Sequence, residues 1–456
     1  MRRGIYLLLR FVSALDHWLR ERLTRAGWLV LGAGAAAAAA GIDLHQTVTA
    51  QAFVLLSALL ALAFVASLGF RARLEVQREL PRYATAGERT AYRVTLTNRG
   101  SATLEGATVA ERFRDPRPAY GQWCRTREPG EEHRNWFDRE VGYFRWRWLI
   151  ERRVPETDDE VALPALPSGA SHSLRLGFTP RHRGRIEFSG IRLGRTDPLG
   201  LVRGLAHHDR AAQVIALPKR YRLPALALPG RRKFQPGGVS LAASVGDSTE
   251  FLALRDYRPG DPLQRLHWKS FARTGKPIVK EFQDEFYERH ALVLDTGRVA
   301  GEDAVFEEAI AVAASFVYTL DTQECLLDLL FVGNHASDAL AMRTYTAGRG
   351  QLHAEHLLEV LAGVTPSAPD DFEVLARTVL ARRASLASLI VVLLGWDEAR
   401  REFLAAARGT GLEVRALLVC AAAATPREHV PGLALLHPGE IERGLAGLRL
   451  SLRRRC

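Results

Sequence analysis

A chain of 456 residues is long enough for two or three domains, each able to bury a core of its own. With 47% hydrophobic and 25% charged residues its composition is globular, which excludes disorder over the whole chain. The net charge of +11 is spread over separate arginine clusters, and no nucleic-acid-binding motif lies beside them. That distribution suits anionic headgroups or solubility better than one nucleic-acid groove, so we expect no nucleic-acid partner.

Residues 1–25 predict an amphipathic helix on the cytosolic surface of a membrane. Apolar residues recur at helical spacing from Ile5 to Leu23, with arginines around them. For the apolar runs that follow, a cleaved signal peptide is the weaker alternative, because its apolar region would come directly after a short basic segment, whereas the charged and amphipathic residues 1–25 come first here.

Residues 26–70 predict a transmembrane hairpin. Val48–Phe70 is an uncharged run that, as a helix rising about 1.5 Å per residue, spans the ~30 Å hydrocarbon core. Ala26–Ile42 is uncharged but shorter, and the short connector Asp43–Thr47 lets the two runs insert together. Arginines on both flanks place both ends in the cytoplasm. We therefore expect a multi-pass protein of the cell (inner) membrane with cytosolic soluble domains, and the lipid bilayer as its first partner.

Residues 71–220 predict an all-β domain. Apolar and polar residues alternate in Ala91–Thr97, and similar short runs recur at Ser173–Phe178, Ile186–Leu193 and Gln213–Ala216. Short strands separated by turns are typical of an immunoglobulin-like sandwich.

An insertion at residues 113–164 contains four tryptophans among many charged residues. Within it, Tyr143–Trp148 alternates aromatic residues with arginines, which predicts a hairpin with one aromatic and one basic face. Two interpretations of the aromatic face remain open: it covers the sandwich, which we favour, or it contacts a partner or lipid headgroups.

Residues 221–285 form a linker and then a segment dense in charged, aromatic and turn-forming residues. It reads E-F-x-x-L-R-x-Y-x-P-G-D from Glu250, then H-W-K-S-x-A-R from His267, then an acidic strand that ends in L-x-L-D. This pattern, with the earlier turn Asp197–Leu201, resembles the bacterial family called domain of unknown function 58 (DUF58). The resemblance implies a membrane-anchored cytosolic protein with a von Willebrand factor A-like domain, often encoded beside a MoxR-type AAA+ ATPase. It implies no established chemistry.

The charged residues of this signature could form an acid–base site or a charge-paired clamp between the sandwich and the domain that follows. We favour the clamp and expect no catalytic residue, because arginine binds carboxylates bidentately and no nucleophile–base pair is evident. The turn at Pro259–Asp261 would also aim Asp261 back at a neighbour. The candidate residues are Glu250, Arg255, Tyr257, Gly260, Asp261, His267, Trp268, Lys269, Arg273 and Glu285.

Residues 286–456 alternate between apolar strands and amphipathic helices, which predicts a parallel sheet covered on both faces. With the family resemblance, this order indicates a Rossmann-type α/β domain of the von Willebrand factor A-like kind. The predicted strands are Ala291–Asp295, Leu326–Val332, Leu389–Leu394 and Val414–Cys420, and the predicted helices are Val305–Thr322, His353–Ala362, Phe372–Ala384 and Asp397–Arg408.

The von Willebrand factor A family binds magnesium through D-x-S-x-S after its first strand, since hard cations need several converging oxygens. Here Asp295 matches the first aspartate and Asp397 could match a distal one. Gly297 and Val299 stand where the serines would be, however, and Arg298 adds a competing cation. We therefore expect no cofactor, with magnesium at Asp295 and Asp397 as the alternative.

These observations predict a membrane-anchored, non-enzymatic interaction or scaffold protein that presents cytosolic domains to a protein partner. By the resemblance, a MoxR-type AAA+ ATPase is the expected partner. The alternative is an enzyme or a metal-dependent binding protein that uses the charged cluster at 250–285 or a site centred on Asp295.

Overall fold

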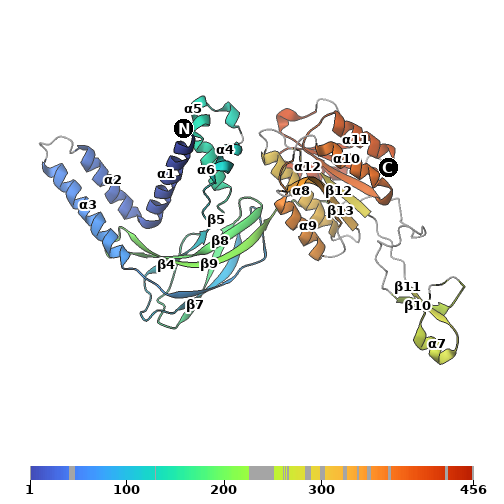
Figure 1. Cartoon of the computed structure of the whole chain (residues 1–456), viewed down its shortest axis with the longest axis horizontal. Coiled ribbons are helices and arrows are strands. Elements are labelled where there is room, and N and C mark those ends of the chain that lie inside the picture. The colour runs from blue at the N-terminus through green and yellow to red at the C-terminus, as the bar shows by residue number, and fades with distance from the viewer. Residues whose placement is uncertain are drawn as a thin grey trace. The chain divides into compact units, whose positions relative to one another are not determined.

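The computed structural model of the chain divides into two compact units (Figure 1). The first contains Met1–Arg220, Val299–Ala314 and Leu358–Val364, and the second contains Tyr221–Arg298, Ser315–Leu357 and Thr365–Cys456. The structure describes residues 2–40, 47–128, 130–224, 251–259, 261, 263, 266–282, 289–297, 303–321, 326–335, 338–346, 351–367, 371–426 and 430–453.

Three helices open the first unit: α1 (Arg2–Arg22), α2 (Arg25–Ala40) and α3 (Thr47–Leu68). Within α3, the stretch Val48–Leu68 is long and apolar enough to cross a membrane, whereas α2 is apolar but shorter. The two helices pack along each other (Figure 1). The predicted helix of the first 25 residues is present as α1, and its contact with a membrane stays a prediction.

Two antiparallel sheets follow. One has the strand order β1 (Leu74–Glu79), β3 (Thr90–Asn98), β7 (Ser171–Thr179) and β5 (Glu156–Thr157). The other has the order β2 (Tyr83–Thr85), β9 (Arg203–Leu217), β8 (Gly184–Thr196), β4 (Ala107–Phe113) and β6 (Val161–Ala162), where only the β2–β9 pair is parallel. Alternate residues of both sheets, such as Val94, Phe178 and Ile191, are fully buried in one shared core. The four predicted strands are all present, because period-two alternation buries one face of each.

The predicted hairpin at Tyr143–Trp148 is wrong. The insertion contains the helices α4 (Tyr120–Arg125), α5 (Trp136–Val141) and α6 (Tyr143–Glu151), followed by the short strands β5 and β6. Gly142 ends α5 in the left-handed conformation at φ 61°, and α6 begins directly after it. Trp146 and Leu149, three positions apart, are the buried residues of α6, so the helical period decides the structure and the alternation of aromatics is incidental.

The two buried tryptophans of the insertion pack on α1 and not on the core of the two sheets. Trp123 and Trp146 are 1% and 2% exposed and pack around Tyr6 of α1, with ring centroids 6.0 and 5.5 Å from the tyrosine ring. Tyr6 also donates a hydrogen bond to the carbonyl of Pro118 (3.1 Å). The insertion is therefore packed on the amphipathic helix α1 through a cluster of its own.

The turn between β8 and β9 is held by one side chain. The Asp197 carboxylate accepts hydrogen bonds from the backbone N–H groups of Leu199, Leu201 and Val202 at 2.8, 2.8 and 2.7 Å. Gly200 adopts a φ of 73°, which a glycine enters without strain. This turn is the one that the sequence pattern predicted.

The turn holds the corner between α1 and α2. Thr24 donates its hydroxyl to the carbonyl of Gly200 (2.6 Å) and its backbone N–H to that of Leu201 (3.1 Å). Leu201 and Val202 lie in an apolar cluster with side chains of α2 and α3. A β-carbon on Gly27 would lie 2.1 Å from the Leu201 carbonyl oxygen, so this corner requires a glycine.

The second unit contains a six-stranded sheet. Its strand order is β14 (Asp338–Thr346), β13 (Leu326–His335), β12 (Arg289–Leu294), β15 (Ser388–Leu393), β16 (Glu413–Val419) and β17 (Leu433–Leu436). All neighbours are parallel except β14, an antiparallel edge strand. Every residue of the central strand β15 is buried, so the sheet is covered on both faces there.

The helices of the α/β region are α8 (Asp303–Asp321), α9 (Gln351–Gly363), α10 (Asp371–Ala381), α11 (Glu398–Gly409) and α12 (Ile441–Arg453). The four predicted strands and four predicted helices are present. The edge strands β14 and β17 and the helix α12 were not predicted.

The close approach at the helix corner generates a test. We expect Gly27→Ala to destabilise the protein by about 1–3 kcal/mol, since the added methyl meets a backbone carbonyl that cannot swing away. Gly32→Ala in the same helix is the control: nothing lies within 4 Å of its added β-carbon, so the better helix former should leave stability unchanged or raised. Thermal unfolding of the full chain in detergent measures both, and equal shifts would contradict the assignment.

Candidate functional site

The family signature forms a small hairpin of its own. Strand β10 (Phe251–Asp256) pairs antiparallel with β11 (Ile278–Phe282), and α7 (Trp268–Thr274) lies between them in the chain. Leu266 bridges to Val279, and these two side chains are 8% and 3% exposed. The core of this signature hairpin is therefore small.

Two of the predicted site residues form a direct ion pair. Arg255 donates two hydrogen bonds to the two carboxylate oxygens of Asp261, at 2.7 and 2.8 Å. The backbone N–H of Arg258 donates a third to this carboxylate (2.9 Å). These hydrogen bonds lower the pKa of Asp261 to about 2, and those from the Arg255 side chain have the largest effect. The turn brings Asp261 back onto its neighbour, as the sequence indicated, while a clamp between domains stays a prediction.

The remaining signature residues have separate environments. The backbone N–H of Tyr257 donates to the carbonyl of Pro277 (3.0 Å), and Lys269 and Arg273 are exposed on α7. Glu250, Gly260 and Glu285 lie outside the described residues.

His267 begins α7 and makes a contact that the sequence analysis missed. Its Nδ1 is hydrogen-bonded to the hydroxyl of Ser270 at 2.6 Å. The spacing of three residues at a helix start was the available signal. In the part of the chain that the structure describes, no carboxylate is hydrogen-bonded to the other ring nitrogen, which is the group that orients the base in a nucleophilic site. The pair is thus a contact at the start of α7.

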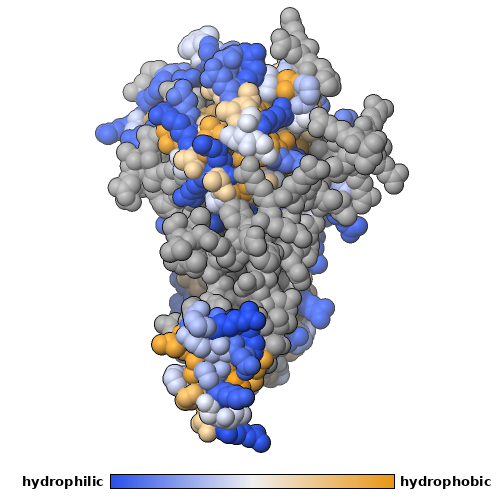
Figure 2. All heavy atoms as spheres, turned by 90° about the vertical axis from the view of Figure 1, so that its right-hand side faces the viewer, coloured by the Kyte–Doolittle hydropathy of each residue, from blue (hydrophilic) through white to orange (hydrophobic). Residues whose placement is uncertain are grey.

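The signature hairpin exposes apolar side chains. Leu263 and Trp268 are 67% and 64% exposed, and Leu254 and Phe271 are 43% and 39% exposed. The rings of Trp268 and Phe271 meet edge to face, with centroids 6.1 Å apart. Figure 2 shows hydrophobic and hydrophilic atoms side by side on this hairpin, at the lower end of the view. We call Leu254, Leu263, Trp268 and Phe271 the hairpin patch.

Asp295 follows β12 at the carboxyl edge of the six-stranded sheet and is 1% exposed. One carboxylate oxygen accepts a hydrogen bond from the backbone N–H of Gly297 (2.9 Å). The other accepts from the backbone N–H of Leu394 (3.2 Å) and from Nε of Arg400 (2.8 Å). The Asp295 carboxylate therefore stabilises its loop through backbone N–H groups and forms an ion pair with an arginine.

Arg400 also joins Asp397 to this group. Asp397 caps the start of α11 by accepting from the Arg400 backbone N–H (3.0 Å), and its carboxylate pairs with the Arg400 guanidinium. Burial opposes the charge of Arg400, but the hydrogen bonds and charges of Asp295 and Asp397 outweigh it and raise the arginine pKa. The two candidate metal ligands are thus brought together around a guanidinium.

Sequence reasoning missed Arg400. Its signal was position: it precedes Phe403, Leu404 and Ala407 on the buried face of α11, where an isolated arginine needs a partner. Among the described residues no group of three or more His, Cys, Asp or Glu side chains is placed to hold a metal. The expected absence of a cofactor stays a prediction.

These features define a mixed α/β protein with a membrane-length apolar helix near its N-terminus and a charged hairpin ahead of its α/β sheet. The model of the family described as "Protein of unknown function DUF58" matches residues 253–421 of this chain. The expected resemblance to this family is confirmed over that region.

Two further proteins are similar to this chain. The "Uncharacterized protein YeaD" of Bacillus subtilis (strain 168) is 26% identical over 224 residues, which cover 49% of this chain and 52% of that protein. The chain thus spans about half the length of this curated relative. The crystal structure of a GH20 exo β-N-acetylglucosaminidase from Vibrio harveyi matches 76% of this chain and 56% of that one, at 9% identity. Its TM-score of 0.13 carries no argument about the fold.

Removing the guanidinium that faces Asp295 should destabilise the α/β region. We expect Arg400→Gln to cost about 3–5 kcal/mol, because it leaves a buried carboxylate without its counter-charge. Adding Asp295→Asn should recover part of the loss. Arg401→Gln is the control, since Arg401 is paired only at the surface, and should change stability by at most ~0.5 kcal/mol. Denaturant unfolding of the full chain decides, and equal losses for both single variants would contradict the assignment.

The Arg255–Asp261 pair has a predicted pH signature. Since the folded pKa of Asp261 is about 2, below the ordinary value of ~3.9, the carboxylate should stay ionised at about pH 3. The stabilisation from the pair is complete above the ordinary pKa and is lost as pH falls through about 2. Arg255→Ala should move the Asp261 titration toward ~4, and Arg273→Ala should not. Carboxyl NMR of selectively labelled protein measures this titration. If the titration midpoint of Asp261 is the same with and without Arg255, the ion pair is excluded.

Proposed function

We propose that this chain is a membrane-anchored, non-enzymatic interaction protein that presents cytosolic domains to a protein partner. The observation that carries the proposal is the hairpin patch: large apolar side chains are exposed within the family signature itself. Trp268 and Phe271 lie in contact on α7, and contiguous exposed apolar groups mark interaction surfaces, whereas scattered single ones do not.

The anchor in this proposal is a hairpin of α2 and α3. The length and composition of Val48–Leu68 support a span, and the packing of α2 along α3 supports paired insertion. Arginines of α1 and those just after α3 favour both flanks on the cytoplasmic side. The protein would then be a multi-pass protein of the inner membrane, with α1 on its cytosolic surface.

The presented parts would be an immunoglobulin-like sandwich and a von Willebrand factor A-like domain. Two antiparallel sheets around one core support the first. Support for the second comes from the mainly parallel six-stranded sheet, with Asp295 directly after β12.

The hairpin patch favours a partner of definite chemistry. Trp268 is the most informative member, since tryptophan and arginine dominate the energetics of protein interfaces. Lys269, Arg273 and Lys276 lie exposed beside it, with no carboxylate paired to them among the described residues. The complementary surface is an apolar pocket with an acidic rim. A MoxR-type AAA+ ATPase is the candidate that the family resemblance offers.

The enzymatic alternative has weaker support. Asp261 is engaged by Arg255 through two hydrogen bonds, and Asp295 is saturated by two backbone N–H groups and Arg400. Groups held in this way are typical of ion pairs that stabilise a fold.

The test uses the full chain in lipid nanodiscs and a purified MoxR-type AAA+ ATPase. Trp268→Ser should weaken binding at least tenfold, about 1.4 kcal/mol, by removing an interface anchor while leaving the melting temperature unchanged. Val374→Ser is the matched control, because Val374 is an exposed apolar residue (39%) on α10, away from the signature. No binding by the unaltered chain would exclude this ATPase as the partner. Binding that survives Trp268→Ser would place the contact elsewhere.

A further inference from the structure

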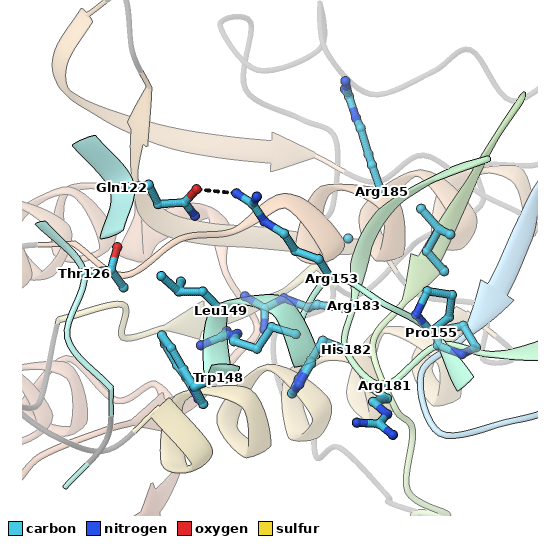
Figure 3. A pocket seen from close by; sticks show the side chains of 14 residues that line it. Gln122, Thr126, Trp148, Leu149, Arg153, Pro155, Arg181, His182, Arg183 and Arg185 are labelled. Carbon is cyan, nitrogen blue, oxygen red and sulfur yellow. Dashed lines mark hydrogen bonds between the residues drawn. The ribbon is translucent and has the colours of Figure 1, made fainter. Parts of the chain in front are cut away.

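A cavity of about 380 Å³ lies in the first unit, beside the helical insertion. Its walls come from α4, from the end of α6 with the segment that follows, and from the segment that leads into β8 (Figure 3). The lining residues are Gln122, Thr126, Trp148, Leu149, Arg152, Arg153, Pro155, Pro180, Arg181, His182, Arg183, Gly184, Arg185 and Ile186.

The lining is strongly cationic: it contains five arginines and a histidine and no acidic side chain. Three of the arginines have carboxylate partners behind the wall. Arg181 lies 3.1 Å from Glu156, and Arg183 and Arg152 both pair with Glu307, which belongs to the same unit. The charge of these three is therefore partly compensated.

The other two arginines have no carboxylate partner among the described residues. Arg153 donates only to neutral acceptors: the Gln122 side-chain oxygen and the carbonyls of Pro116 and Arg117. Burial, followed by the charge of the nearby Arg114, lowers the pKa of Arg153, and the nearby Asp115 opposes this only in part. Arg185 is exposed at the same cavity. Figure 3 shows Arg153 directed toward Gln122 across the cavity.

The rest of the lining suits a ligand with a polar and a flat apolar part. The pKa of His182 is lowered, mainly by burial and secondly by the charge of Arg152. A neutral imidazole ring carries one N–H that can donate a hydrogen bond. Trp148 and Leu149 form an apolar wall on one side, and the Trp148 ring lies 4.7 Å from the Arg152 guanidinium. Guanidinium groups bind phosphate through paired N–H donors, which a solvated lysine does not reproduce.

We propose that this cavity binds a phosphate-bearing ligand, with Arg153 and Arg185 as the principal anion-binding residues. Trp148 and Leu149 contact the apolar part of the ligand. The phosphate could belong to a soluble phosphorylated compound or to a lipid headgroup. The proposal stands on a different part of the chain from the hairpin patch, so either can fail alone.

The test is calorimetric titration of the full chain, in nanodiscs of zwitterionic phosphatidylcholine, with inorganic pyrophosphate. We expect saturable binding that Arg153→Gln and Arg185→Gln each weaken about tenfold or more, as the loss of a charge-assisted hydrogen bond requires. Arg175→Gln is the control: Arg175 is exposed on β7 and does not line the cavity. The side chain of Arg185 makes no hydrogen bond or ion pair in the described part of the chain, so the Arg185 variant tests binding even if the Arg153 variant does not fold.

Nanodiscs that contain phosphatidic acid separate the two sources. If they abolish pyrophosphate binding by the unaltered chain, the cavity takes a lipid headgroup. If they leave it unchanged, it takes a soluble compound. Either outcome supports the phosphate site. Titrations that never saturate, or that the Arg175 control weakens as much as the cavity variants do, would overturn it.

Discussion

The attachment of the N-terminal helices to the β sheets depends on the carboxylate of Asp197. By accepting three backbone N–H groups it satisfies the polar atoms of a turn that would otherwise need water. The turn can therefore place Leu201 and Val202 among the side chains of α2 and α3. The membrane-length helix α3 and the two β sheets are thus joined through one small apolar cluster.

Buried arginines and surface basic residues differ in whether a carboxylate lies close to them. Inside, carboxylates meet arginines at close range: Arg400 faces Asp295, and Arg78 and Glu111, each 3% exposed, pair between strands of the two sheets. Beside the hairpin patch, Lys269, Arg273 and Lys276 have no carboxylate partner among the described residues, and in the cationic cavity the same holds for Arg153 and Arg185. Since nearby counter-charges lower the free energy of a buried ion, these two surfaces are where an external anion or acidic protein gains most.

The sequence predicts those elements whose signal is local and unambiguous. The long uninterrupted apolar run in α3 is typical of a membrane-length helix. The alternation of apolar and polar residues in β3, β7 and β8 has a period of two, which a helix does not have. In Tyr143–Trp148 two periods coexist, and only the packing around Tyr6 selects the helix. Tertiary packing of this kind overrides local pattern.

The distance in sequence between two residues also decides which contacts of the candidate sites could be predicted. Arg255 and Asp261 are six positions apart, so a turn was enough to predict that Asp261 points back at a neighbour. Arg400 and Asp295 are 105 positions apart and meet only when β12 and α11 are in place. The cationic cavity is lined from three separate segments and had no signature in any of them.

The ribosome makes the α1–α2 corner well before it makes the turn that binds this corner. Thr24 and the Gly200 carbonyl that it binds are separated by 176 positions. At roughly 5–20 residues per second, the ribosome needs about 10–35 s to make the intervening chain. During this interval the α1–α2 corner exists without its turn, and the Thr24 hydroxyl must find another acceptor. Completion of β8 and β9 is then the step that fixes the helices to the β sheets, so a ribosome that stalls before residue 200 would leave them unattached.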